Sequence, residues 1–267
     1  AFDAIQVSGA DGIQLSFLNA YPTVAVLLAF LAGMIIAALS GLFLEKIAYR
    51  PLRGAPRLVP LISAIGASIF LQNAGQLLFG PQRRQYMNPV VLDRGIGWNL
   101  EVAGSTVVLT YTGIFSLILS AILMVGLYLL VQRTKLGRAM RAVAQDKKTA
   151  ALMGINVDQI ISRTFVISGA LAGAAGVMWG IHNGLFNYFV GFLPGIKAFT
   201  AAVLGGIGNI PGAMLGGMFL GIVESVGPAV LGIDFQLKDV LAFTILILVL
   251  IFRPSGILGD ALTEEKV

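Results

Sequence analysis

Long apolar stretches alternate with short polar segments along most of this chain. The first stretch, residues 22–44, would form a helix about 34 Å long, enough to cross a hydrocarbon core of about 30 Å. Pro194 and Gly195 are expected to break the fifth stretch, and the seventh is short for a span. The pattern therefore predicts an all-α, polytopic transmembrane bundle that forms one domain over residues 1–267. Seven stretches are candidate spans: 22–44, 58–79, 111–132, 164–182, 188–208, 212–230 and 239–252.

The composition fits a lipid environment better than water. Hydrophobic residues make up 57% of the chain and charged residues only 12%, whereas a soluble domain has about 25% charged residues. The net charge of +5 does not indicate nucleic-acid binding, because the Lys and Arg residues lie at the ends of apolar stretches and not in a patch with aromatic residues. The lack of cysteine excludes disulfide bonds and thiolate metal sites.

Lys and Arg residues concentrate in residues 46–57, in residues 133–163 and after residue 252. Cytoplasmic loops of membrane proteins carry an excess of these residues. We therefore expect all three segments, including the C-terminus, to be cytoplasmic, although three arginines between residues 80 and 110 weaken the asymmetry. Residues 1–21 then form an extracytoplasmic segment, which lacks the basic start and apolar core of a signal peptide. The chain begins at Ala1 without an initiator Met, so a trimmed or incomplete N-terminus is expected.

The segment 133–163 predicts a short cytoplasmic helix with one polar side. Gly154 suits the left-handed conformation that ends a helix, and Asp158 is expected to cap the next helix at Gln159. Two interpretations remain open: the helix lies at the lipid headgroups, or it presents a projecting corner to a soluble subunit. The polar residues recur every three or four positions: Arg138, Arg141, Gln145 and Lys148.

Small residues are abundant in the second half of the chain. Glycines three or four residues apart predict close helix packing, a main source of helix association in lipid. The run 204–217 holds Pro211 and several glycines, so a turn on the cytoplasmic side is favoured over a discontinuous helix beside a solute path. The spaced glycines are Gly169, Gly173, Gly176, Gly180 and Gly184, then Gly212, Gly216, Gly217 and Gly221.

The sequence gives little support for catalysis. It has one histidine, His182, without a second group at a spacing typical of a catalytic dyad or metal site. It also lacks the phosphate-binding pattern G-x-x-x-x-G-K-[ST]. We therefore expect no bound metal or cofactor, and no ATP hydrolysis by this chain itself.

Polar residues inside the apolar stretches are candidates for a translocation pathway. Glu224 is the only acidic residue well inside such a stretch, where it either lines the path or forms a hydrogen bond that locks two helices. Gln72 and Asn73 line the path or form interhelical contacts. His182 and Asn183 line the path or occupy a wet position at the outer end of a helix.

Five blocks of sequence resemble the LivH-type permease of branched-chain amino acid ABC importers. The similarity covers nearly everything from about residue 22 onward. The additional N-terminal helices with an Asn-Phe-Ala-His-Gly stretch that are usual in this family do not occur, so either helices are missing before residue 1 or the N-terminus has diverged. The blocks are 45–53 (EKIAYRPLR), 61–66 (LISAIG), 133–156 (RTKLGRAMRAVAQDKKTAALMGIN), 197–217 (KAFTAAVLGGIGNIPGAMLGG) and 253–259 (RPSGILG).

The resemblance implies an ABC importer permease in a bacterial-type cytoplasmic membrane. Its implied partners are a second, LivM-like permease subunit, two cytoplasmic ATPase subunits that bind the ATP, and an extracytoplasmic solute-binding protein. The resemblance also implies a coupling motif that seats a short helix in the ATPase, with Lys148 at the position where the family has an acidic residue. The implied motif residues are Lys148, Thr149, Ala150, Ala151 and Gly154.

The function implied by the resemblance is inward transport of leucine, isoleucine or valine. A permease of the same lineage for urea or short amides is the nearest alternative, because the spans themselves do not discriminate between these solutes. An ATP-independent carrier or channel would need coupling charges inside the bundle, for which Glu224 is the only candidate. An intramembrane enzyme is the third alternative.

Overall fold

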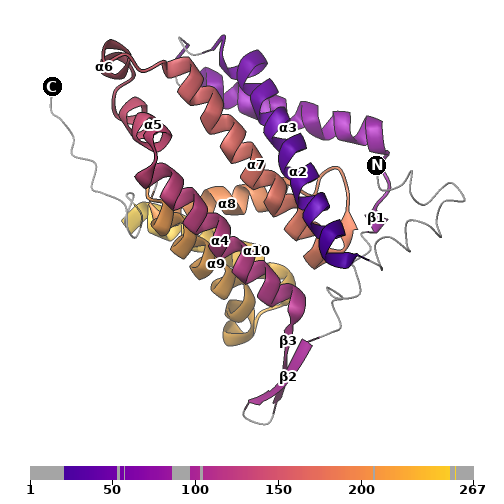
Figure 1. Ribbon diagram of the computed structural model, residues 1–267. Helices are drawn as coiled ribbons and strands as arrows, with labels where there is room; N and C mark the ends of the chain where they lie inside the picture. The colour runs from indigo at the N-terminus through magenta and orange to yellow at the C-terminus, as the bar shows by residue number, and fades with distance from the viewer. Residues whose placement is uncertain are drawn as a thin grey trace, which may run out of the picture. The chain divides into compact units, whose positions relative to one another are not determined.

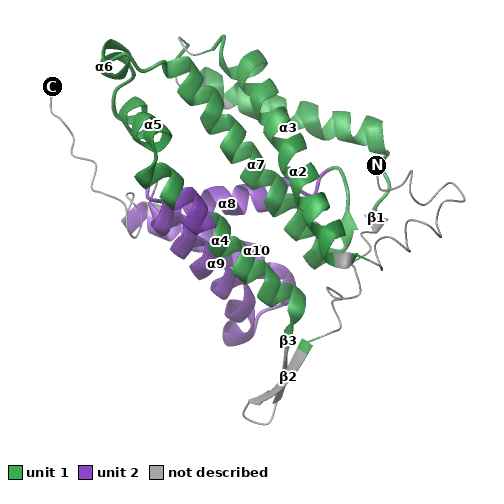
Figure 2. Ribbon diagram, viewed as in Figure 1, with its two compact units in different colours: residues 1–123, 129–188 green, residues 124–128, 189–267 purple. Residues whose placement is uncertain are grey.

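The computed structural model describes residues 21–52, 55–56, 58–85, 97–102, 105–206, 208–252 and 256. The chain divides into two compact units (Figure 2). Unit 1 comprises residues 1–123 and 129–188, and unit 2 comprises residues 124–128 and 189–267. The expected extracytoplasmic segment, apart from Tyr21, lies outside the described residues, as do Arg53, Arg57, Arg94, Arg253 and Lys266.

Helices form in all seven apolar stretches (Figure 1). In chain order the helical elements are α2 (Pro22–Leu44), η1 (Glu45–Tyr49), α3 (Leu58–Phe79), α4 (Tyr111–Arg133), α5 (Lys135–Gln145), α6 (Lys147–Leu152), α7 (Val157–Asn183), α8 (Phe192–Gly205), α9 (Ile210–Leu231), η3 (Phe235–Leu237) and α10 (Lys238–Phe252). The short strands are β1 (Arg84–Gln85), β2 (Gly97–Val102), β3 (Ser105–Thr110) and β4 (Leu185–Phe186).

Five helices in the described part of the chain are long and apolar enough to cross a membrane, which confirms the predicted polytopic helical bundle. They are α2 with η1, α3, α4, α7 and α9. Their apolar side chains are largely exposed in the isolated chain, as expected for helices that face lipid or other membrane helices. Helices α8 and α10 have 14 and 15 residues. At about 1.5 Å per residue they fall short of a full span of about 30 Å.

Several helix ends and one predicted break differ from the sequence predictions. Pro194 does not break α8; it lies in the first turn, where a missing N–H costs no helical hydrogen bond. Glu45 does not end the first helix, because the chain continues into the π-helix η1, in which the Arg50 amide donates to the Glu45 carbonyl at 2.7 Å. Helix α7 begins at Val157, well before the predicted residue 164.

Helices α2 and α7 pack backbone to backbone through small residues in unit 1. A Cβ added to Gly169 would lie 2.6 Å from the Ala37 carbonyl oxygen, and one added to Gly41 would lie 2.8 Å from the Phe165 carbonyl oxygen. Near the other end of this contact, a Cβ on Gly33 would lie 2.7 Å from Val177 Cγ2. The two helices are therefore antiparallel, and their close approach requires glycine on both sides.

The ends of α3 and α7 are joined by an antiparallel pairing of β1 with β4. Arg84 pairs with Phe186, and Gln85 pairs with Leu185. This pairing places the C-terminal ends of α3 and α7 on one side of unit 1. The N-terminal end of α7, the π-helix η1 and the helices α5 and α6 therefore lie toward the opposite side (Figure 1). The basic segments that begin at Lys46 and at Arg133 thus share one end of the unit.

In unit 2, α8 and α9 form an antiparallel helical hairpin. The backbones of Gly205 and Gly212 approach so closely that neither residue has space for an added Cβ. Helix α8 ends at Gly205 and α9 begins at Ile210, as the interpretation of this run as a turn requires. The Asn209 side chain caps α9 by accepting a hydrogen bond from the Gly212 amide at 3.1 Å. An added Cβ on Gly256 would lie 2.6 Å from the Val203 carbonyl oxygen and 2.6 Å from the Gly206 amide nitrogen, so Gly256 lies against this turn.

Candidate functional site

The corner between α4 and α5 is rigid. Thr134 caps α5 by accepting a hydrogen bond from the Gly137 amide at 3.0 Å, and its hydroxyl donates to the Leu130 carbonyl at 2.5 Å. A Cβ on Gly137 would overlap with the carbonyl groups at the end of α4. The Arg141 side chain also donates to the Gln132 side chain across the corner. These contacts fix the direction in which α5 leaves the membrane-spanning helix.

The predicted short helix is two helices, α5 and α6, which meet at Asp146. The Asp146 carboxylate caps α6 by accepting from the Lys148 amide at 2.8 Å and from the Thr149 hydroxyl. The Thr149 hydrogen bond and then the Lys148 amide hold the pKa of Asp146 below its ordinary value. Thr149 therefore stabilises the start of α6, in addition to the role that the resemblance implies for it.

Helix α6 ends in a Schellman motif, which confirms the left-handed conformation expected of Gly154. Gly154 has a φ of +81°, and its amide donates to the Ala151 carbonyl at 3.0 Å. The Ile155 amide donates to the Ala150 carbonyl at 3.1 Å. The motif reverses the chain within a few residues, so the position of α6 directly determines where α7 begins.

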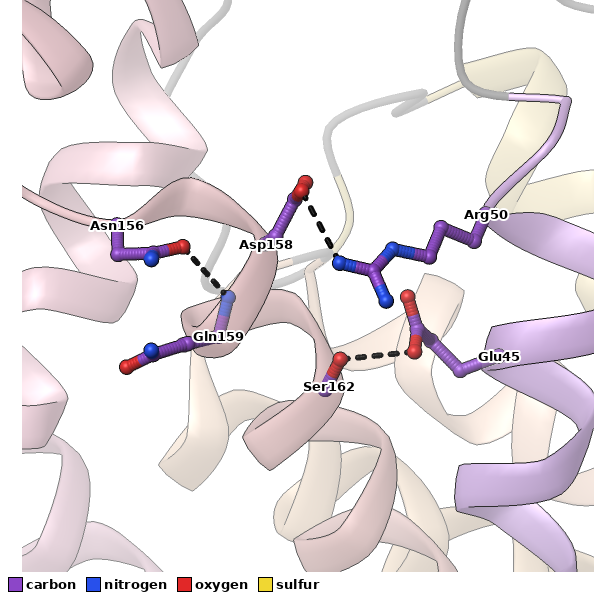
Figure 3. A network of polar contacts seen from close by, with 6 residues as sticks. All are labelled: Glu45, Arg50, Asn156, Asp158, Gln159 and Ser162. Atoms are coloured by element: carbon purple, nitrogen blue, oxygen red, sulfur yellow. Dashed lines mark hydrogen bonds and ion pairs between the residues drawn. The ribbon is translucent and has the colours of Figure 1, made fainter.

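Helix α7 is capped by Asn156, so the prediction of Asp158 as the cap is wrong. The Asn156 side-chain oxygen accepts from the Gln159 amide at 3.1 Å (Figure 3). Asp158 lies in the first turn of α7, where a carboxylate is favoured by the partial positive charge of the helix start. It pairs instead with Arg50, whose Nη2 lies 3.3 Å from Asp158 Oδ2.

The corner formed by α5, α6 and the start of α7 has its own apolar core and an exposed tip. Val143, Ala150 and Ile160 are buried together in this core. Ala150 therefore acts through packing, whereas Lys148, Thr149, Ala151 and Gly154 are exposed. Two residues that the sequence analysis did not single out project from the tip: Leu152 is 87% exposed and Met153 is 79% exposed.

A second polar site links η1 to the first turns of α7. The Glu45 side chain has no exposed surface, and its Oε2 accepts a hydrogen bond from Ser162 Oγ at 2.8 Å (Figure 3). The rings of Tyr49 and Phe165 pack beside this contact, with their centroids 5.2 Å apart. Sequence analysis missed this site, because Glu45 follows an apolar run and looks like its polar end.

In unit 2 the structure gives Glu224 two charged neighbours. Lys197 Nζ from α8 lies 2.9 Å from Glu224 Oε1 of α9 and 2.6 Å from Asp239 Oδ1 of α10. The side chains of Lys197, Glu224 and Asp239 are 20%, 18% and 35% exposed. We call these three residues the ion cluster. They tie all three helices together, and opposite charges inside consecutive apolar stretches could have revealed the pairing from the sequence.

Three of the other pathway candidates make local contacts in the described structure, and the fourth, His182, is exposed. Gln72 donates to Ser68 Oγ at 3.1 Å, and Asn73 donates to the Ile69 carbonyl at 2.8 Å, both within α3. Asn183 donates to the Trp179 carbonyl at 3.1 Å at the exposed end of α7, next to the exposed His182. These four residues belong to unit 1 and Glu224 belongs to unit 2. Their joint role as a pathway stays a prediction.

Comparisons with known proteins agree with the resemblance found in the sequence. The family model described as "branched-chain amino acid transport system / permease component" matches residues 6–250. The chain is 50% identical over 265 residues to BraD of Pseudomonas aeruginosa, a high-affinity branched-chain amino acid transport system permease protein. That match covers 99% of this chain and 82% of BraD.

More distant relatives are also permeases. The chain is 44% identical over 236 residues to LivH of Escherichia coli K12, a match that covers 88% of this chain and 75% of LivH. It is 27% identical over 239 residues to the fructose import permease protein FrcC of Rhizobium meliloti, covering 84% of this chain and 60% of FrcC. No solved structure matches the chain significantly.

These matches confirm that the chain is a multi-pass membrane protein and a transporter subunit, not an enzyme. The corner formed by α5, α6 and the start of α7 and the helical bundle described above are therefore parts of a permease. The chain belongs to the family of permease components of branched-chain amino acid transport systems.

Proposed function

We propose that this chain carries leucine, isoleucine and valine inward across a bacterial-type cytoplasmic membrane, as one subunit of an ATP-driven importer. The observation that carries the proposal is the 50% identity to BraD over nearly the whole chain. A phosphate-binding loop is absent from the sequence, so the ATP would be bound and hydrolysed by separate subunits. The proposed partners are a second, LivM-like permease subunit, two cytoplasmic ATPase subunits and an extracytoplasmic solute-binding protein.

The proposed orientation places two parts of the chain in the cytoplasm: the C-terminus, and the corner formed by α5, α6 and the start of α7, which we call the coupling corner. Both basic segments of unit 1 occupy the end of the unit at which α5 and α6 are found, and cytoplasmic loops are rich in Lys and Arg. In unit 2, Gly256 lies against the turn between α8 and α9. A cytoplasmic C-terminus therefore implies that this turn is cytoplasmic as well.

The coupling corner is the proposed contact with the ATPase. Lys148, Thr149, Ala151 and Gly154 would contribute to the contact surface, while Ala150 supports it from the core. The apolar tip formed by Leu152 and Met153 suits insertion into a cleft, because exposed apolar residues in a cytoplasmic loop indicate a partner. ATP binding and hydrolysis in the partner would then move α6 and, through the Schellman motif, α7.

Replacing Leu152 with aspartate is expected to weaken ATPase binding about 30-fold, the loss typical of a buried interface anchor. Folding should be unaffected, because Leu152 is almost fully exposed in this chain. The measurement is co-purification and titration of the ATPase subunit with detergent-solubilised permease. Ala144→Asp, an exposed position on α5, serves as the matched control and should bind normally. Unchanged ATPase binding by the Leu152 variant would show that the tip is not part of the proposed contact.

Uptake measurements test the transported solute. Proteoliposomes that contain the complete importer and its binding protein should accumulate radiolabelled leucine only when ATP is supplied on the cytoplasmic side. Accumulation of urea or acetamide in place of leucine would assign the chain to the alternative solute class. Leucine uptake that continues without ATP would instead indicate a carrier or channel and overturn the proposal.

A further inference from the structure

A buried carboxylate at the end of a membrane-spanning helix needs a physical explanation. Glu45 has no exposed surface, and burying such a group is costly unless hydrogen bonds compensate for the lost water. An apolar residue would fill the same volume at lower cost. Glu45 also begins the π-helix η1, and π-helical turns inside α-helices occur frequently at functional sites.

The partner of Glu45 lies on a face of α7 that contacts both η1 and α2. Along this face, Asp158 pairs with Arg50, Ser162 donates to Glu45, and Phe165 packs on Tyr49 (Figure 3). The next positions on the same face are Gly169 and Gly173, which contact α2. One face of α7 therefore holds η1 by polar contacts and α2 by close backbone packing.

The same first turns of α7 receive α5 and α6. Ile160 is buried with Val143 and Ala150 of the coupling corner, two residues before Ser162. Helix η1 in turn contacts α3. A displacement of α6 would thus reach α7 first, and the contacts between α7 and η1, among them the one between Ser162 and Glu45, would carry it on to η1 and α3.

We propose that the hydrogen bond between Ser162 and the buried Glu45 is a coupling link, which transmits movement of the coupling corner from α7 to η1 and α3. Glu45 and Ser162 are positioning residues in this role, since neither needs to touch the solute or the ATPase. The polar contact fixes one register between η1 and α7, where an apolar contact would permit sliding. This inference rests on the proposed function, because it requires a motor that acts on α6.

The experiment compares leucine uptake with ATP hydrolysis in proteoliposomes that contain the complete importer. Ser162→Ala removes the donor and should lower the number of leucine molecules transported per ATP about tenfold or more, the loss expected for a hydrogen bond to a charged group. ATPase binding and ATP hydrolysis should persist. Ser162→Thr keeps a hydroxyl and should restore most of the transport per ATP.

Ser168→Ala is the matched control. Ser168 also lies on α7, but its hydroxyl donates to the Phe165 carbonyl of its own helix, so its loss should leave transport per ATP unchanged. Glu45→Met, which removes the acceptor, should lower the ratio as Ser162→Ala does. The double variant should be no worse than Glu45→Met alone, because the loss of the Ser162 hydroxyl then breaks no further link.

Each outcome decides for or against the link. Uptake and hydrolysis that fall in parallel in the Ser162→Ala variant would make the contact merely structural and overturn the inference, while the proposed function would stand. An unchanged ratio in Ser162→Ala would overturn it in the same way. A lack of ATP-driven leucine uptake by the unaltered importer would overturn the proposed function and, with it, this inference.

Discussion

Replacing Gly173 with alanine is expected to destabilise the protein by about 2–3 kcal/mol, the cost of overfilling a well-packed contact. The added Cβ would lie 2.7 Å from the Gly33 carbonyl carbon and 2.9 Å from Ala37 Cβ. Backbone atoms cannot rotate out of the way as a flexible side chain can. Helices α2 and α7 would have to separate, which would weaken their contact along the whole face. The measurement is thermal unfolding of the detergent-solubilised chain.

Gly176 provides the matched control for this prediction. It lies one helical turn further along α7, and an added Cβ would meet nothing within 4 Å. Alanine is the better helix former by about 1 kcal/mol, so Gly176→Ala should be neutral or slightly stabilising. The same substitution is therefore expected to have opposite signs at two nearby glycines. A Gly173→Ala variant as stable as the unaltered chain would mean that α2 and α7 do not pack along this face.

The positions of the helices could be predicted from hydropathy alone. The α-helices over residues 22–44 and 58–79 have the predicted bounds, although the first continues beyond Leu44 as the π-helix η1. The left-handed conformation of Gly154 was also predictable, since it depends on local backbone sterics. Such features depend on neighbours within a few residues, which a sequence displays directly.

The pairing of helices could be predicted only in part. In lipid, an apolar face that packs on another helix has the same composition as one that faces acyl chains. Glycine spacing is the remaining signal, and it identified Gly169 and Gly173 but also Gly176, which has open space beside it. Comparing the spacing of Gly33 and Gly41 with that of the α7 glycines would have indicated the partner helix.

The polar sites could not be read from local sequence, because their members are far apart. Arg50 and Asp158 are 108 residues apart, and Glu45 and Ser162 are 117 residues apart. Each of these residues has an ordinary local explanation as a helix end or cap. Glu224 was identifiable because a charge inside an apolar stretch has no such explanation. The basic residue that pairs with it, Lys197, is likewise an isolated charge in an apolar stretch.

Removing Lys197 is expected to be the most damaging single change in unit 2. Lys197→Met would leave Glu224 and Asp239 as two neighbouring carboxylates without the cation that compensates for their partial burial. Breaking a buried pair in this way typically costs 3–5 kcal/mol. Because Asp239 is 35% exposed and partly screened, we expect about 2–3 kcal/mol. Thermal unfolding of the solubilised chain measures this loss, and an undiminished stability would show that the ion cluster does not hold α8, α9 and α10 together.

A neutral version of the ion cluster separates the two roles that Glu224 could have. In the triple variant Lys197→Met, Glu224→Gln, Asp239→Asn no charge is left unpaired, so most of the lost stability should return. If leucine uptake also returns, the role of Glu224 is to hold the three helices together, because uncharged side chains of similar shape can replace the ion cluster. If stability returns while uptake does not, the charge of the cluster acts on the solute or its path. The ion pairs with Lys197 favour the first result, since a carboxylate already bound to a lysine is less available to a passing ammonium group.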